Sequence, residues 1–121
     1  MAKIIDGNIE KLPEFSKKGG WFFGSFIKDL PEFRNDNFEI KWANNKAGYY
    51  DYSRKTDYSA MTLAINVSGH AKITFPDKNE VFTLSNPGDF VYWDTQDGDH
   101  IFESLDNSIV IAIRWPSRKI E

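Results

Sequence analysis

His100 is the residue whose type and position best suit chemistry, and it is one of two histidines in the chain. It follows an acidic turn at 94–99 and precedes an apolar segment, so its imidazole could face a pocket or merely begin a strand. A catalytic metal usually takes at least three protein donors. Asp51 and Asp57 could add carboxylates to His100 and hold iron or manganese. Because both carboxylates would have to fold inward, we expect no metal and no other cofactor.

The acidic turn before His100 allows two interpretations. Asp94, Asp97 and Asp99 stand around Gly98, and their carboxylates could bind calcium. The spacing does not match an EF-hand loop, and Asp and Gly are common turn residues, so we interpret the segment as a solvated turn between two strands. We also expect the carboxylates of Asp97 and Asp99 to favour the protonated form of His100.

Four further residues are candidate ligand-binding residues beside His100: Tyr92, Asn66, Tyr50 and Arg114. Tyrosines can pack against a sugar ring or another flat organic ligand, or they can be strand residues with an apolar body and a hydrated hydroxyl. Arg114 interrupts an otherwise apolar strand. If it points inward it needs a carboxylate partner, and it could then bind an acidic ligand; otherwise it lies at the rim of the pocket.

Short alternating segments separated by turns must position these residues. From Trp21 onward the turn signals recur at roughly 8–12-residue spacing, which is typical of an all-β sandwich or barrel. No segment keeps a helical period beyond two turns, and Pro116 ends the last strand because proline cannot donate to a ladder. We expect antiparallel strands within residues 21–27, 38–43, 60–69, 70–75, 81–84, 90–93, 100–104 and 108–115.

Side-chain alternation also bears on a pocket. In residues 60–69 the large apolar residues share one face, and Thr62, Ala64 and Asn66 share the other. This second face could line a lumen that holds solvent or a ligand, or it could meet bulk water. Residues 108–115 carry large apolar side chains on both faces, so we expect both of those faces to be covered.

Composition limits the function classes. Of the 121 residues, 16% are aromatic and 40% are apolar, which excludes disorder and fits one domain with a core. The net charge of −3 comes from mixed acidic and basic residues without a basic cluster, which argues against nucleic-acid binding and against a membrane contact. There is no cysteine to act as a nucleophile or metal ligand, and no apolar leader, so we expect a cytoplasmic protein.

A resemblance to a known family rests on residues 88–100 and 109–117. The segment from Gly88 through Trp93 to His100 resembles the second motif of the cupin superfamily, in which a histidine follows a glycine-bearing turn. The ending at 109–117 is similar to a group of small single-domain cupins that end in Arg-Trp-Pro-Ser. The resemblance implies a single cupin-type antiparallel β-barrel of the jelly-roll kind. We expect it to span 21–121, after an irregular lead-in at 1–20.

The chain departs from the cupin pattern where the family holds its metal. The first motif normally supplies two histidines and a glutamate, yet residues 44–62 contain neither residue type. Counting back from Gly69, the glutamate position falls near Thr62. The resemblance therefore implies a barrel that lacks the usual metal triad.

Three functions remain open at the level of sequence. The first is a barrel that binds a small organic ligand, sugar-like or a small acid. The second is an enzyme, either metal-dependent like cupin dioxygenases or metal-free with His100 as the acid–base group, as in cupin-fold sugar epimerases. The third is a structural or partner-binding module whose barrel is filled by its own side chains. We also expect a homodimer formed through the N-terminal strands.

Overall fold

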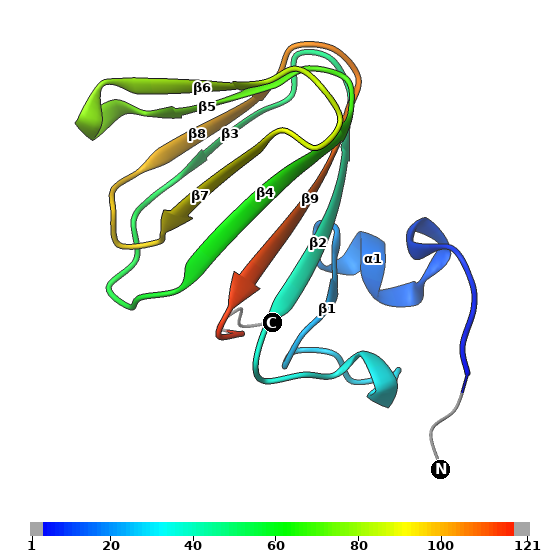
Figure 1. Ribbon diagram of the computed structural model, residues 1–121. Helices are drawn as coiled ribbons and strands as arrows, with labels where there is room; N and C mark the ends of the chain where they lie inside the picture. Colours follow the sequence, from blue (N-terminus) through cyan, green and yellow to red (C-terminus); the bar gives the residue numbers. More distant parts are fainter. Residues whose placement is uncertain (1–3, 118–121) are drawn as a thin grey trace.

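The computed structural model describes residues 4–117, which fold mainly into antiparallel strands (Figure 1). One short α-helix, α1 (Pro13–Lys17), and three 3-10 turns accompany the strands: η1 (Ile9–Lys11), η2 (Pro31–Phe33) and η3 (Pro76–Lys78). The strands are β1 (Trp21–Phe23), β2 (Glu39–Asn45), β3 (Tyr50–Ser53), β4 (Met61–Ser68), β5 (Ala71–Phe75), β6 (Glu80–Leu84), β7 (Phe90–Asp94), β8 (His100–Ser104) and β9 (Ser108–Trp115).

Two antiparallel sheets face each other. The five-stranded sheet has the order β1-β2-β9-β4-β7, and the four-stranded sheet has the order β3-β8-β5-β6. The prediction of an all-β antiparallel fold is confirmed, but the expected closed barrel is a two-sheet sandwich, because the hydrogen-bonded ladders of the two sheets do not join. Along one side of the sandwich, the edge strands β6 and β7 therefore lie free.

Most strands lie where alternation predicted them, and β9 matches its expected range to the residue. The expected strand at 21–27 ends at Phe23, because the chain turns at Gly24, which has a φ of +149°. Strand β3 was not predicted, because it alternates exposed tyrosines with polar residues instead of presenting an apolar face. A strand that lines a polar cavity lacks the hydrophobic pattern that identifies ordinary strands.

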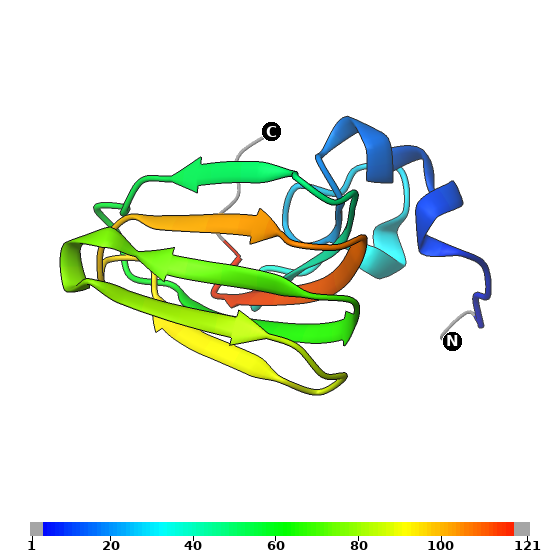
Figure 2. The same cartoon turned by 90° about the horizontal axis from the view of Figure 1, so that it is seen from above.

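The N-terminal segment is attached to the outside of β2. Figure 2 shows α1 and η1 at one end of the sandwich, beside the first strands. Glu10 accepts hydrogen bonds from Trp42 Nε1 at 2.7 Å and from Asn44 Nδ2 at 2.8 Å. The lead-in is thus tied to the domain by polar contacts and includes η1 and α1. No helix within residues 4–117 is long and apolar enough to cross a membrane.

The hydrophobic core fills only part of the space between the sheets. It is centred on strands β4 to β7 and contains Ala64, Ile73, Phe75, Leu84, Val91, Trp93 and Val110. A second cluster of Trp21, Phe26 and Ile27 seals the end of the sandwich near β1. Burying each large side chain stabilises the fold by roughly 1.5–3 kcal/mol. Between β2–β9 and β3–β8 the inward side chains are smaller and more polar, and a cavity remains there.

The turns at one end of the sandwich meet at Gly69, between β4 and β5. Gly69 has a φ of +77°, and a Cβ at this position would lie 2.0 Å from the carbonyl oxygen of Asn107, in the turn between β8 and β9. Only glycine allows this approach, so Gly69 fixes the relative position of the two turns.

Replacing Gly69 by alanine tests this junction, with Gly48→Ala as a matched control. Gly48 also has a positive φ, +90°, but a Cβ there would meet nothing within 4 Å. Gly48→Ala should cost only the roughly 1–2 kcal/mol of a left-handed alanine. Gly69→Ala should cost roughly 3 kcal/mol or more, because the backbone must also move. Urea unfolding measures both values, and equal losses would contradict the close approach as the cause.

Candidate functional site

A cavity of about 290 Å³ lies between the two sheets, in the part that the core leaves unfilled. Its walls come mainly from the inward faces of β2, β3, β4, β8 and β9. The space exists because three neighbouring strands place alanine there: Ala43 on β2, Ala112 on β9 and Ala64 on β4, with Ala64 and Ala112 directly opposite each other. Small side chains at facing positions leave a void that larger ones would fill.

His100 lines this cavity and is also the first residue of β8. Its ring packs against Trp93 and Phe75, with centroid separations of 5.0 Å and 6.0 Å. The pKa of His100 is lowered to about 4, first by burial and then by the positive charges of Arg114 and Lys41, which outweigh the opposite effect of the Asp51 and Asp99 carboxylates. The imidazole is therefore neutral at pH 7, with one donor and one acceptor nitrogen.

The acidic turn was predicted to favour protonated His100, but the net pKa of the ring is lowered. The charge of Asp99 does raise this pKa, as predicted, but burial of the ring lowers it more. Asp99 also accepts hydrogen bonds from Tyr52 Oη at 2.6 Å and from the Lys55 amide at 2.8 Å. Asp97 accepts from the Asp94 amide at 2.9 Å.

Arg114 points inward and has the carboxylate partner that an inward arginine requires. Glu39, which lies opposite it on β2, is fully buried and accepts from Arg114 Nη1 at 3.1 Å. Ser117 Oγ donates to the other oxygen of Glu39 at 2.9 Å. The guanidinium also lies over the Trp21 ring, 4.7 Å from its centroid, which adds a cation–π contact.

Two polar atoms at the cavity wall lack a hydrogen-bond partner among residues 4–117. They are Thr62 Oγ1 and Arg114 Nε, both buried. Trp93 Nε1 is in the same condition, but Trp93 also borders a second depression. Leaving such an atom unsatisfied costs about 1–3 kcal/mol. Both residues line the cavity, but the two atoms themselves have almost no accessible surface, so a polar occupant reaches them only if neighbouring side chains shift.

The other predicted ligand-binding residues do not line the cavity. Tyr92 and Tyr50 point outward, with 54% and 56% of their surfaces exposed. Their sequence neighbours Trp93, Tyr49 and Asp51 point inward instead, because successive residues of a strand face opposite sides. Tyr92 and Tyr50 therefore belong to strands that border the cavity, but their side chains lie on the opposite face of those strands.

Asn66 points inward but lies beyond the end of the cavity. Its Nδ2 donates to the carbonyl oxygens of Gly69 at 3.0 Å and Asn86 at 3.1 Å. These bonds join the turn after β4 to the turn before β7, so Asn66 supports the fold there. Lys41 lines the cavity and was not predicted, whereas Thr62 and Ala64 belong to the face of β4 that was expected either to line a lumen or to meet water. The sequence signal for Lys41 and Thr62 was the alternation of side chains: on β2 and β4 the large apolar residues share one face, and Lys41 and Thr62 lie on the other.

The donor set does not fit a catalytic metal. Asp51 lies in the cavity with His100, whereas Asp57 does not. Nowhere in residues 4–117 do three or more His, Cys, Asp or Glu side chains gather closely enough to hold a metal ion. Thr62, at the position that the resemblance assigns to a glutamate ligand, lines the cavity with a neutral hydroxyl. One imidazole and one carboxylate fall short of the usual three donors.

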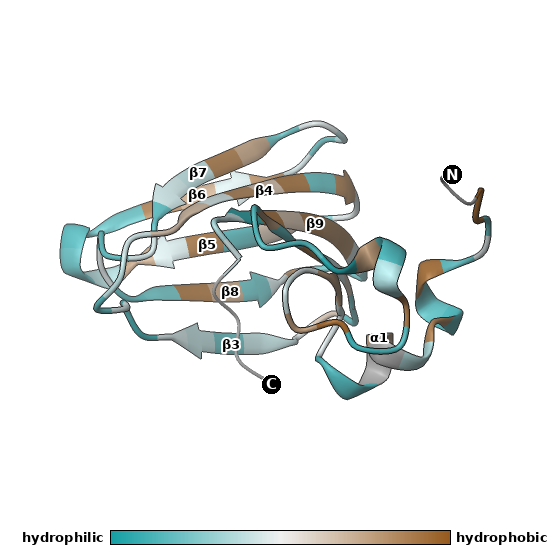
Figure 3. Ribbon diagram, turned by 90° about the horizontal axis from the view of Figure 1, so that it is seen from below, coloured by the Kyte–Doolittle hydropathy of each residue, from teal (hydrophilic) through white to brown (hydrophobic). Residues whose placement is uncertain are grey.

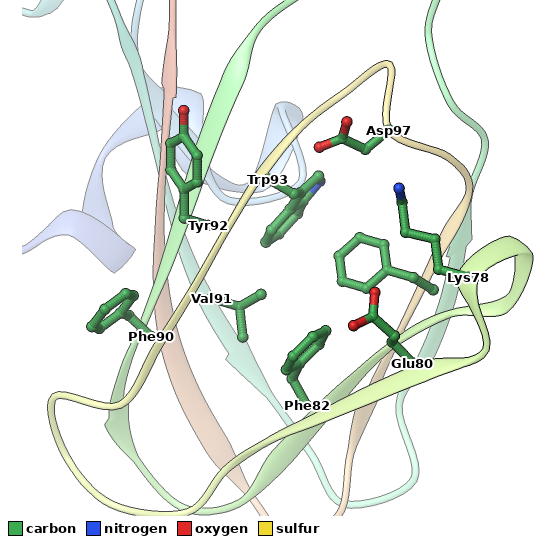
Figure 4. Close-up of a pocket in the computed structure, with 9 residues that line it drawn as sticks. Lys78, Glu80, Phe82, Phe90, Val91, Tyr92, Trp93 and Asp97 are labelled. Atoms are coloured by element: carbon green, nitrogen blue, oxygen red, sulfur yellow. The ribbon is translucent and has the colours of Figure 1, made fainter.

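A second, larger depression of about 430 Å³ lies along the free edges of β6 and β7 (Figure 4). Aromatic side chains dominate it, including Phe82, Phe90 and Trp93, and Lys78, Glu80 and Asp97 lie at its border. It is an open groove at the edge of the sandwich. The smaller cavity is lined by the neutral histidine, the partly buried arginine and the unsatisfied hydroxyl, so we regard it as the candidate site.

Solved cupin structures resemble this chain in fold. A cupin protein of the RmlC type from Desulfovibrio desulfuricans superposes with a TM-score of 0.61 at 13% identity, over 94% of this chain and 98% of that one. A cupin-superfamily sugar phosphate isomerase from Silicibacter pomeroyi gives 0.53 at 12% identity, over 69% of this chain and 52% of that one. An HTH_3 family transcriptional regulator from Vibrio cholerae gives 0.58 at 13% identity, over 76% and 48%.

The comparisons by sequence are negative. No family model matches the chain, and no curated protein matches it. At these identities the structural likeness establishes the cupin fold alone. Enzymes and regulators share that fold, so the function must be argued from the cavity.

The lowered pKa of His100 predicts a pH-dependent stability. Between about pH 4 and pH 6.5 the unfolded chain binds a proton at His100 that the folded chain does not, so stability rises with pH through this window and is fully present above it. The drop in pKa from 6.5 to about 4 corresponds to roughly 3 kcal/mol. His100→Asn should remove this part of the slope.

Urea unfolding at about pH 4.5 and about pH 7 measures the slope, and the difference between wild type and variant isolates His100 from the carboxylates that titrate nearby. His70→Asn is the control, because His70 is exposed and pairs with Asp106 far from the cavity. An unchanged slope in His100→Asn would show that the ring is hydrated in the folded protein.

Proposed function

We propose that the chain binds a small hydroxylated organic acid in the cavity between its sheets, without a metal ion. The observation that carries the proposal is the pair of buried, unsatisfied atoms at the cavity wall, Thr62 Oγ1 and Arg114 Nε. Buried polar groups in folded proteins nearly always have hydrogen-bond partners. Because these two atoms have none in the free chain, we infer that a bound ligand supplies them.

The chemistry of the wall supports an acid with hydroxyl groups. Glu39 takes one nitrogen of Arg114, and Nε remains to donate to a carboxylate oxygen. Neutral His100 can donate to one hydroxyl and accept from another, and Thr62 can do the same. The rings of Trp21 and Phe102 supply apolar surface for the carbon skeleton.

The volume supports a small molecule. At about 290 Å³ the cavity lies at the lower end of the roughly 300–1,000 Å³ that ligand pockets occupy. Sugar-sized acids fit this range, whereas nucleotides exceed it.

His100 and Asp51 line one cavity, which keeps metal-free acid–base catalysis as the alternative. The low pKa of His100 argues against acid–base catalysis. A general base works best when its pKa lies near the operating pH, and a pKa of about 4 leaves the imidazole a weak base at pH 7. Binding therefore has more support than catalysis in the free protein.

Thr62→Val tests the proposal with a variant of nearly the same shape. Removing the unsatisfied hydroxyl should raise the free energy of unfolding by about 1 kcal/mol without ligand, and it should weaken ligand binding by removing a partner. Thermal shift and titration calorimetry with gluconate, galacturonate and tartrate, against neutral galactose, measure the second effect. Thr74→Val, on the outer face of β5, should leave ligand binding unchanged.

Ala112→Leu fills the cavity and leaves the Glu39–Arg114 pair in place. It should abolish the thermal shift caused by the acids while the folded spectrum remains. The proposal fails if none of the acids shifts the wild-type melting temperature, or if Ala112→Leu responds as the wild type does.

A further inference from the structure

The outward face of the five-stranded sheet is apolar across three neighbouring strands. The register of β4 with β9 and β7 aligns Leu63 with Ile113 and Tyr92, and Ile65 with Ile111 and Phe90. Neighbouring strands lie about 4.8 Å apart, so these two rows form one continuous surface. We call these six side chains the outer apolar face. Figure 3 shows apolar segments along β4, β7 and β9.

The outer apolar face lies on the opposite side of the sheet from the cavity. The residues that alternate with it, such as Thr62 and Ala64, are buried between the sheets. Phe90 and Tyr92 are 66% and 54% exposed, and they therefore lie in water in a single chain. The helical segment α1 does not cover them, because it lies beside β1 and β2 (Figures 1 and 2).

The other sheet provides an internal comparison. The outward face of the four-stranded sheet is mixed. It carries the ion pair Lys72–Glu103, at 3.7 Å, with Thr74 and Thr83 beside it. Its apolar residues, Val81, Ile101 and the tyrosines of β3, are interleaved with these polar ones. Polar residues of this kind are usual on the solvated face of an antiparallel sheet. The five-stranded sheet departs from that pattern, and contiguous apolar patches on soluble proteins mark interaction sites.

We infer that the outer apolar face binds the same face of a second copy of this chain. A two-fold contact sets a patch against itself, so the patch must be complementary to its own copy. None of the six side chains is charged, hence no like charges meet, and flat sheets with alternating side chains pack face to face about 10 Å apart. The contact lies on β4, β7 and β9 instead of the N-terminal strands expected from the sequence.

The composition of the face agrees with a dimer contact. The exposed parts of Phe90, Tyr92 and the neighbouring Trp115 leave roughly 300 Å² of aromatic surface in water. The four aliphatic side chains are only partly exposed and add less than this, so the face is small, below the roughly 800 Å² that each partner buries in a standard interface. Asp94, at the end of β7, gives the polar rim that such interfaces have. The chain has a net charge of −3, which offers no attraction to an anionic membrane.

Phe90→Glu and Val81→Glu form a matched pair for the test. Both residues are apolar, lie on edge strands and are exposed, at 66% and 58%, but Val81 belongs to the four-stranded sheet. Both substitutions should leave the fold intact, which circular dichroism checks. Sedimentation equilibrium then measures the mass. Wild type and Val81→Glu should have twice the 14.0 kDa of one chain, and Phe90→Glu should dissociate at least about 100-fold more readily.

A second readout separates dissociation from unfolding. The melting temperature of a dimer rises with protein concentration, so wild type and Val81→Glu should show this rise between about 1 and about 100 μM, and Phe90→Glu should not. A monomeric wild type at about 100 μM overturns the inference, as does binding of that monomer to phosphatidylcholine vesicles, which would make the face a membrane contact. A dimer that Phe90→Glu leaves intact overturns it as well. None of these outcomes bears on the cavity.

Discussion

The two-residue period of β4 and β9, with small or polar side chains inward and large aliphatic ones outward, is the constraint on which the rest of the structure depends. Most half-buried strands do the reverse. Here Ala64 faces Ala112 inside, and Ile65 faces Ile111 outside. This single arrangement leaves the sandwich hollow between β2–β9 and β3–β8, and it exposes an apolar face to the surroundings. The cavity and the proposed dimer contact are therefore two consequences of one pattern.

Burial governs the charges inside the sandwich. Glu39 and Arg114 offset each other across neighbouring strands, because either charge alone would be costly away from water. Buried ion pairs add little stability over apolar side chains, so the pair suits a binding role better than a purely structural one. The same desolvation keeps His100 neutral, which leaves a polar but weakly basic wall. A carboxylate ligand would add the negative charge that Arg114 Nε and this wall can accept.

The cupin fold by itself leaves the function open, since an isomerase and a transcriptional regulator have similar structures. In this chain the inward positions of the fold carry Thr62, Asp51 and a single histidine. The described residues cannot assemble three metal donors, but they surround a cavity with donors, acceptors and aromatic rings. These side chains are the basis of the proposal that the cavity binds a small polar ligand.

The sequence by itself determined the fold class and most of the strands, though not β3, because turn residues and alternation are local properties. It also determined that an inward Arg114 needs a carboxylate partner. Only the tertiary structure decided which face of each strand is inside. Alternation predicts that Leu63 and Ile65 lie on one side of β4, and that Tyr92 lies on the opposite side of β7 from Trp93. It does not predict which side of each strand meets the other sheet. Which side of a strand faces inward depends on the side chains that strands far apart in the sequence bring together between the two sheets. The neutral state of His100 follows from the same packing, because burial is the main cause of its low pKa.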